Sequence, residues 1–190
     1  MREKATKQLF KSIKSPKVLH IATHSEDDSL LTDWSESYIG HNVLDDHLKS
    51  YLALAGANTE RHKKFSDPNV GVVTAYDVIY MDLVGTELVT LSSCYSGVGT
   101  TVRGLSEAVF GFRNAFACAG AKRMVVSLWE AGDRATNEIM KKFYKKIKER
   151  TCNSCVEALQ QAQREVRTEY PEFKQWAAFI FIGNPDLFDL

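Results

Sequence analysis

The sequence predicts an α/β protein with a mostly parallel central sheet and helices on both faces. Apolar runs rich in β-branched residues alternate with segments of helical periodicity, which is typical of strand–helix–strand crossovers and parallel sheets. Two of the apolar runs, residues 18–24 and 88–94, end at a histidine and at a cysteine. A chain of 190 residues is long enough to bury the core of one such domain.

The first half of the chain is expected to begin with a short amphipathic helix. Leu9 and Ile13 lie at helical spacing, and Pro16 stops this segment before the first strand. Thr74 and Asp77 have the spacing at which a hydroxyl and a carboxylate satisfy the first amides of a helix. The elements expected are a helix within 1–17, a strand at 18–23, a loop over 25–47, a strand at 51–56, a loop over 58–71, a helix over 74–83 and a strand at 87–93.

The second half continues the alternation with longer helices. Asp133 opens a helix whose predicted inner face holds Ile139, Met140, Phe143 and Ile147. Ser154 and Glu157 form a capping-box pattern at the start of a second helix, with Val156, Leu159, Ala162 and Val166 expected inside. The elements expected are a loop over 96–104, a helix over 107–119, a strand at 123–129, helices from 133 and from 154 to before Pro171, and a strand at 176–182.

Composition and charge narrow the function classes. Lys plus Arg and Asp plus Glu both number 24, so the net charge is zero and nucleic acid is not expected as a direct partner. No apolar run approaches the ~18 residues of a membrane span, and the N-terminus lacks the apolar core of a secretory signal. A membrane partner is therefore not expected. The four cysteines show no disulfide spacing, which predicts a cytoplasmic protein with free thiols.

The strand ends at His24 and Cys94 are the main candidates for chemistry. The carboxyl ends of parallel strands meet at one edge of a sheet, so the imidazole and the thiol would form a nucleophile and its base. From its position alone, Cys94 is equally well interpreted as a buried structural cysteine. His20 lies within its strand and is expected to be a hydrogen-bonded core residue. The remaining histidines are expected on polar loops: His41, His47 and His62.

Metal and cofactor sites are not expected. Cys152 and Cys155 have CxxC spacing but no second pair, so a zinc site is not predicted. Gly97 and Gly99 lack the third glycine of a dinucleotide-binding loop and the acid that follows it.

Acidic residues after the strand at 123–129 are candidates for binding a cationic side chain. Asp133 lies just beyond that strand, and its simplest alternative role is N-cap of the helix that follows. Glu130 is a second candidate for the same pocket, and Asp77 and Asp82 are weaker ones.

Seven stretches, taken in order, resemble the CHAT domain, a caspase- and separase-related cysteine peptidase family. They are 19–24 (LHIATH), 54–59 (LAGANT), 74–83 (TAYDVIYMDL), 85–99 (GTELVTLSSCYSGVG), 111–121 (GFRNAFACAGA), 127–136 (SLWEAGDRAT) and 176–183 (WAAFIFIG). The resemblance implies a caspase-like fold, a His24/Cys94 dyad, a sensor or regulatory partner, and Asp133 as acceptor of a basic substrate residue. Two positions depart from the family pattern: Ser25 replaces the usual glycine, and Tyr95 replaces a frequent acid.

The resemblance also bears on domain organisation. Residues 1–17 are expected to form an N-terminal helix or linker, and 18–190 the peptidase domain. Family members normally have at least one strand before the histidine strand, and none is predicted here. The chain would then be a fragment, or its sheet would be completed by another polypeptide at an open edge.

The expected function is that of a cysteine endopeptidase, a thiol protease that cleaves protein substrates without a metal or organic cofactor. Cys94 would attack the scissile carbonyl, and the backbone amides of Ser25 and Cys94 would stabilise the oxyanion. The alternative is a catalytically inactive caspase-like module that binds a protein partner, which Ser25 and the missing strand favour.

Overall fold

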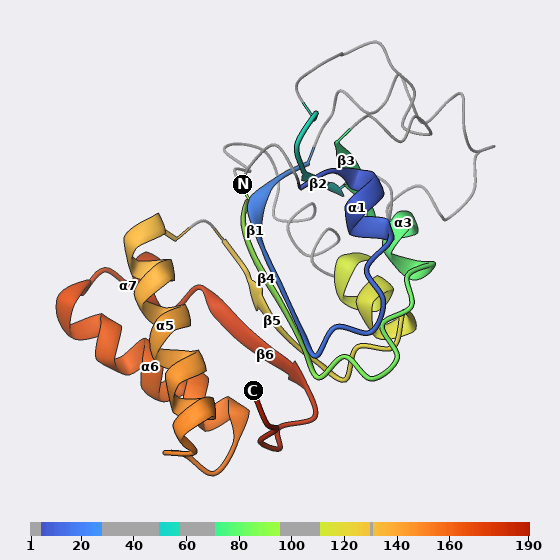
Figure 1. The fold of residues 1–190 in the computed structure, drawn as a ribbon. Helices are drawn as coiled ribbons and strands as arrows, with labels where there is room; N and C mark the ends of the chain where they lie inside the picture. Colours follow the sequence, from blue (N-terminus) through green and yellow to red (C-terminus); the bar gives the residue numbers. More distant parts are fainter. Residues whose placement is uncertain (1–4, 28–49, 58–70, 96–110, 130) are drawn as a thin grey trace.

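A six-stranded sheet organises the part of the chain that the computed structural model describes, residues 5–27, 50–57, 71–95, 111–129 and 131–190. The strand order is β3-β2-β1-β4-β5-β6 (Figure 1). The strands are β1 (Val18–Asp27), β2 (Ser50–Ala53), β3 (Val72–Thr74), β4 (Leu88–Tyr95), β5 (Arg123–Ser127) and β6 (Phe179–Gly183).

Four of these strands run in one direction, which confirms the predicted mostly parallel sheet. β1 pairs in parallel with β4, and β4 with β5. β2 is antiparallel to β1 and β3 is antiparallel to β2, so β3 has the direction of β1. β6 closes the other side of the sheet antiparallel to β5.

Helices cover both faces of the sheet, as predicted. Figure 1 shows α5, α6 and α7 on one face, and α1, α3 and a helix over residues 111–118 on the other. The labelled helices are α1 (Lys7–Lys11), α3 (Ala75–Ile79), α5 (Asp133–Glu149), α6 (Cys155–Glu169) and α7 (Phe173–Trp176).

Each face of the sheet has its own hydrophobic core, and neighbouring strand residues alternate between the two. Val89 packs in the core below α1, α3 and the 111–118 helix, whereas Leu88 packs in the core below α5 and α6. Met124 and Val125 of β5 divide in the same way. This two-residue period follows from the pleat of a strand and fixes which face each residue meets.

The predicted helix faces are largely confirmed. In α5, the four residues expected inside are all buried: Ile139, Met140, Phe143 and Ile147. In α6, Leu159, Ala162 and Val166 are buried, but Cys155 and Ala158 complete the buried face in place of the half-buried Val156. The helical period therefore predicted most of the buried face of α6, but at its first turn Cys155 is buried and not Val156.

Several expectations about the elements were wrong. β3 had not been predicted, because two valines between Gly71 and Thr74 are too short a run to identify without their partner strand β2. The last strand begins at Phe179 and not at Trp176, since a short helix, α7, occupies the preceding residues. The strand predicted to begin at Tyr51 begins at Ser50 and ends at Ala53.

Asp77 attaches helix α1 to helix α3. Its carboxylate lies 2.8 Å from Lys7 Nζ and 3.0 Å from Lys11 Nζ. It also accepts a hydrogen bond from the Thr74 amide, while the Thr74 hydroxyl accepts one from the Asp77 amide, so the predicted capping box is confirmed. Burial by itself would raise the pKa of Asp77, but Lys7, the Thr74 amide and Lys11 outweigh it and lower this pKa.

We expect Asp77→Asn to destabilise the protein by about 3 kcal/mol at neutral pH, because Lys7 is buried against this carboxylate. Lys11→Met should cost less than about 1 kcal/mol, since the Lys11 side chain is half exposed. Urea unfolding measures both. The folded-state pKa is lowered, so the stabilisation is present above the unfolded value near 3.8 and is lost as the pH falls through the folded value. A difference between wild type and Asp77→Asn that does not shrink in acid would contradict this assignment.

Candidate active site

His24 and Cys94 lie directly opposite each other on neighbouring parallel strands. The β1–β4 ladder pairs Cα positions from Val18 with Leu88 through Ser25 with Tyr95, and His24 is the partner of Cys94. Both positions are close to the carboxyl ends of their strands. The side chains of His24, Ser25 and Cys94 lie outside the described part of the structure, as do His41, His47 and His62.

The strands do not end at these two residues, which corrects a prediction. β1 continues to Asp27 and β4 to Tyr95, so residues 25–27, which were expected in a loop, belong to β1. The physical reason is β2, which pairs antiparallel with the end of β1 from His24 with Ala53 to Asp27 with Ser50. Ser25 therefore has Cα partners on both sides, Leu52 in β2 and Tyr95 in β4.

Asp133 is the first residue of α5 and is exposed beside an open cleft. The N-cap of α5 is Gly132, so the expected alternative role of Asp133 as N-cap is wrong. The amide of Gly132 donates a hydrogen bond to Gln175 Oε1 of α7 at 3.0 Å. The cleft has a volume of about 430 Å³ and is lined by Gly132, Asp133, Arg134, Ala135, Glu169, Tyr170, Pro171, Glu172 and Gln175. Glu130 lies outside the described residues.

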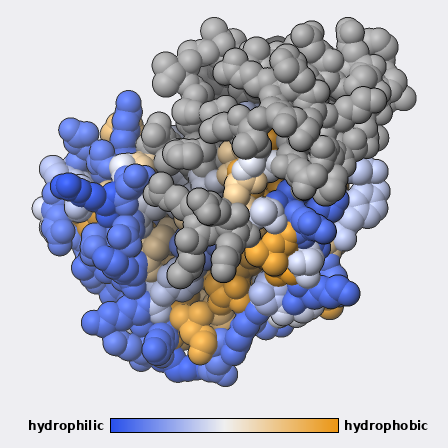
Figure 2. Space-filling model, turned by 45° about the horizontal axis from the view of Figure 1, so that its top comes forward, coloured by the Kyte–Doolittle hydropathy of each residue, from blue (hydrophilic) through white to orange (hydrophobic). Residues whose placement is uncertain are grey.

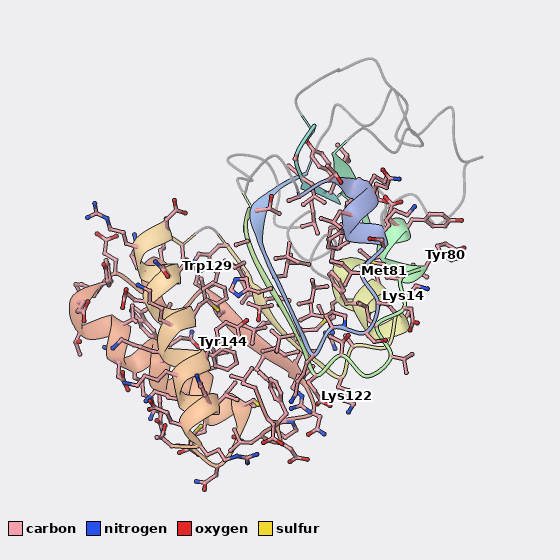
Figure 3. The ribbon with its side chains drawn as sticks, in the orientation of Figure 1. Lys14, Tyr80, Met81, Lys122, Trp129 and Tyr144 are labelled. Carbon is pink, nitrogen blue, oxygen red and sulfur yellow. The ribbon has the colours of Figure 1, made fainter. Side chains whose placement is uncertain are left out.

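His20 is hydrogen-bonded, as predicted, but it is not a core residue. Its Nδ1 lies 3.0 Å from the hydroxyl of Tyr144, which lies 2.7 Å from the hydroxyl of Thr90. Thr90 is fully buried, whereas part of the His20 side chain is exposed. Figure 3 shows Tyr144 reaching from α5 toward the sheet. The desolvation of the ring against α5 lowers the pKa of His20, so its neutral form is favoured at neutral pH.

The hydrogen bonds of Tyr144 with His20 and Thr90 lie four residues before the candidate dyad along β1 and β4. His20 and Thr90 are Cα partners in the same ladder that pairs His24 with Cys94 four residues later. The hydroxyl of Tyr144, a residue of α5, therefore joins this helix to β1 and β4. The sequence provided no signal for Tyr144, because it lies 124 residues from His20 and 54 from Thr90.

Comparison with protein families identifies the domain: residues 1–184 match the CHAT domain. The chain belongs to the CHAT domain family. The resemblance predicted from seven short stretches is thus confirmed, and with it a caspase-like family and fold. The matched region includes the N-terminal residues 1–17. No curated protein matched the sequence.

Cys152 and Cys155 of this CHAT domain are buried thiols that contact backbone carbonyls. Cys155 Sγ donates to Asp186 O at 3.1 Å, and Cys152 Sγ lies 3.9 Å from Lys146 O. Burial raises the pKa of both thiols and disfavours the thiolate that metal binding or nucleophilic attack requires. Both cysteines therefore serve the packing of α5, α6 and the C-terminal segment.

Asp77 and Asp82, the weaker candidates for a substrate pocket, also have structural contacts in the CHAT domain. Asp77 is engaged by Lys7 and Lys11, and the backbone oxygen of Asp82 accepts a hydrogen bond from Ser15 at 2.8 Å. Among the described residues, no helix combines the length and apolar character that crossing a bilayer requires.

We expect Tyr144→Phe to destabilise the CHAT domain by about 1–2 kcal/mol, because the buried Thr90 hydroxyl loses its partner. Tyr80→Phe is the matched control and should cost less than about 0.5 kcal/mol, since the Tyr80 hydroxyl is exposed and donates to the hydroxyl of another exposed tyrosine, Tyr76. Denaturant unfolding compares the two. Thr90→Val should lower the free energy of unfolding less in the Tyr144→Phe background than in the wild type. Equal losses in the two backgrounds would contradict a hydrogen bond between Thr90 and Tyr144.

Proposed function

We propose that this CHAT domain is a cysteine endopeptidase that uses His24 and Cys94 as its catalytic dyad. The observation that carries the proposal is the pairing of these two residues across neighbouring parallel strands, near the carboxyl ends of both. Ligands and catalytic groups collect at this edge in open α/β sheets. Membership of a caspase-like family supports the same chemistry.

The proposed reaction proceeds through a thioester. The Cys94 sulfur attacks the scissile carbonyl carbon, and the backbone amides of Ser25 and Cys94 stabilise the negative oxygen that forms. His24 takes the proton of the Cys94 thiol during this attack and gives it to the leaving amine, which departs as the new N-terminus of the product. Water then attacks the thioester with His24 as general base, releasing the carboxylate product and restoring the thiol.

The position of the dyad along the ladder suggests which face of the sheet the substrate meets. Residues four apart in a strand have the same parity. Positions 24 and 94 therefore have the same parity as positions 20 and 90, whose side chains contact Tyr144 of α5. We expect the substrate on the α5 face, where Asp133 begins α5.

We propose that Asp133 binds a basic side chain, Arg or Lys, immediately before the cleaved bond. Its carboxylate is exposed at a cleft that also contains Glu169 and Glu172, so the cleft carries more negative than positive side chains. Glu130, three residues before Asp133, is proposed as a second contributor from its sequence position.

The proposed substrates are proteins, and the proposed control is a regulatory or sensor protein or domain, as is common for the family. The chemistry requires a reduced thiol, and the described cysteines are free: Cys118, Cys152 and Cys155. We therefore place the activity in a reducing cytoplasm.

We expect Cys94→Ala and His24→Ala each to lower the rate of cleavage at least about a thousandfold, because each removes a group that forms or breaks bonds. Mapping of new protein N-termini in cells that produce the full-length protein measures this loss. Cys118→Ala is the matched control, since Cys118 is an exposed free cysteine on the 111–118 helix, and should keep the same N-termini.

Cleavage products that persist in both dyad variants would contradict the proposed mechanism. An absence of products in the wild type, together with ordinary reactivity of Cys94 toward an electrophilic peptide ending in Arg, would favour the inactive interaction module.

We expect Asp133→Asn to reduce the preference for Arg before the cut by about tenfold, equivalent to about 1.4 kcal/mol. The same N-terminal mapping provides the residue preference. Glu138→Gln is the control, because Glu138 lies further along α5, pairs with Lys141 and does not line the cleft. An apolar or acidic residue before the cut in the wild type would exclude Asp133 from substrate recognition.

A further inference from the structure

The segment that leads from β5 to α5 is anchored at its start by α7 and by the chain just beyond it. The Leu128 amide donates to Ala178 O at 2.8 Å. The Trp129 indole N–H donates to Lys174 O at 2.9 Å, and the Trp129 ring meets the Phe173 ring edge-on, with 6.0 Å between the ring centroids. Figure 3 shows Trp129 on the side of the sheet that α5 covers. The first two residues after β5 are therefore held in place by residues 173–178.

Gln175 of α7 holds the other end of this segment, next to Asp133. The Gly132 amide donates to Gln175 Oε1 at 3.0 Å, and Gly132 is the N-cap of α5. A Cβ atom added to Gly132 would lie 2.7 Å from this oxygen, so a glycine at position 132 leaves room for the hydrogen bond. Gln175, Gly132 and Asp133 all line the cleft of about 430 Å³. Gln175 thus contacts the residue directly before the proposed binding carboxylate.

α7 is itself attached to α6, so Gln175 lies on a fixed element. Gln163 of α6 donates through Nε2 to Trp176 O at 2.9 Å and to Phe179 O at 3.3 Å. The Arg167 guanidinium lies over the Trp176 ring, 5.1 Å from its centroid. A side chain on such an element offers its hydrogen-bond acceptor at a defined position.

Apolar packing contributes little to the position of the Asp133 carboxylate. The residue is exposed, and the surface over α5, α6 and α7, on the left of Figure 2, is mostly hydrophilic. The position of this carboxylate therefore depends on the backbone of the first turn of α5. The hydrogen bond between Gly132 and Gln175 links that backbone to α7.

The same segment begins at the level of the proposed dyad. The β4–β5 ladder pairs Leu91 with Val126, and three residues further along the chain on each side the count reaches Cys94 and Trp129. Trp129 packs against the core on the α5 face, where we expect the substrate. The segment anchored by α7 thus runs from the level of the dyad positions to the cleft beside Asp133.

We propose that Gln175 is a positioning residue of the peptidase: by holding Gly132, it sets the Asp133 carboxylate where a basic substrate side chain binds. A backbone amide can only donate, so the side chain at position 175 must offer a strong acceptor, which glutamine has and methionine, of similar length, lacks. Gln175 acts through Asp133 and not on the reacting atoms. The inference rests on the proposed peptidase function and on the proposed role of Asp133.

Two peptides that differ in one charge test this role. Both carry the sequence of a cleavage site found by the mapping of new N-termini. One has Arg before the cut, and the other has citrulline, which has nearly the same shape without the positive charge. The full-length protein should cleave the Arg peptide with the higher kcat/KM. Gln175→Met should lower this Arg-to-citrulline ratio about fivefold, the effect of one hydrogen bond, by raising KM for the Arg peptide at unchanged kcat.

Gly132→Ala supplies a second variant, because its Cβ would displace the Gln175 carboxamide. It should lower the ratio by a similar factor, and the double variant should lose no more than either single one, since both remove the same hydrogen bond. Gln160→Met is the matched control, at an exposed glutamine of α6 that does not line the cleft, and should keep the wild-type ratio. Circular dichroism and urea unfolding establish that the variants fold, and Gly132→Ala remains decisive if Gln175→Met does not.

A ratio that stays unchanged in both Gln175→Met and Gly132→Ala, while the wild type prefers Arg, would overturn the role of Gln175 and leave the proposed function intact. Losses that add in the double variant, or an equal fall in kcat for both peptides, would also overturn it. A wild type without any cleavage site contradicts the proposed function, and one that cleaves both peptides equally contradicts the role of Asp133. The inference on Gln175 falls with either result.

Discussion

The parallel ladder between β1 and β4 is the constraint on which the rest of this structure depends. It sets His24 opposite Cys94, and it carries the residues of both cores on alternate positions. A slip of one residue would place Cys94 opposite Thr23 or Ser25. It would also exchange the faces on which Leu88 and Val89 are buried. The cost of misplacing these core residues therefore fixes the spacing of the dyad positions.

The periodicity of hydrophobic residues predicted the helices that bury one regular face. It did not predict strands that form only because a neighbouring strand pairs with them. The inner face of α5 could be read from its four buried residues, because each recurs at the helical period. The extension of β1 could not be read, since Ser25, Glu26 and Asp27 are polar and become a strand through pairing with β2. The two valines of β3 likewise need β2 to be recognised.

The candidate site shows the same division between local and distant information. His24 could be preferred to His20 because its place near the carboxyl end of a strand is a local property. The role of Gly132 as N-cap could not be predicted, since its hydrogen-bond acceptor, Gln175, comes from α7. Tyr144 was missed for the same reason: its two partners belong to strands far away in the sequence.

β1 combines two properties that are usually found on different strands. It carries one member of the proposed dyad, and half of its length is an edge with no partner in the described structure. A strand paired on one side is held by fewer hydrogen bonds than one paired on both, so its local opening costs less free energy.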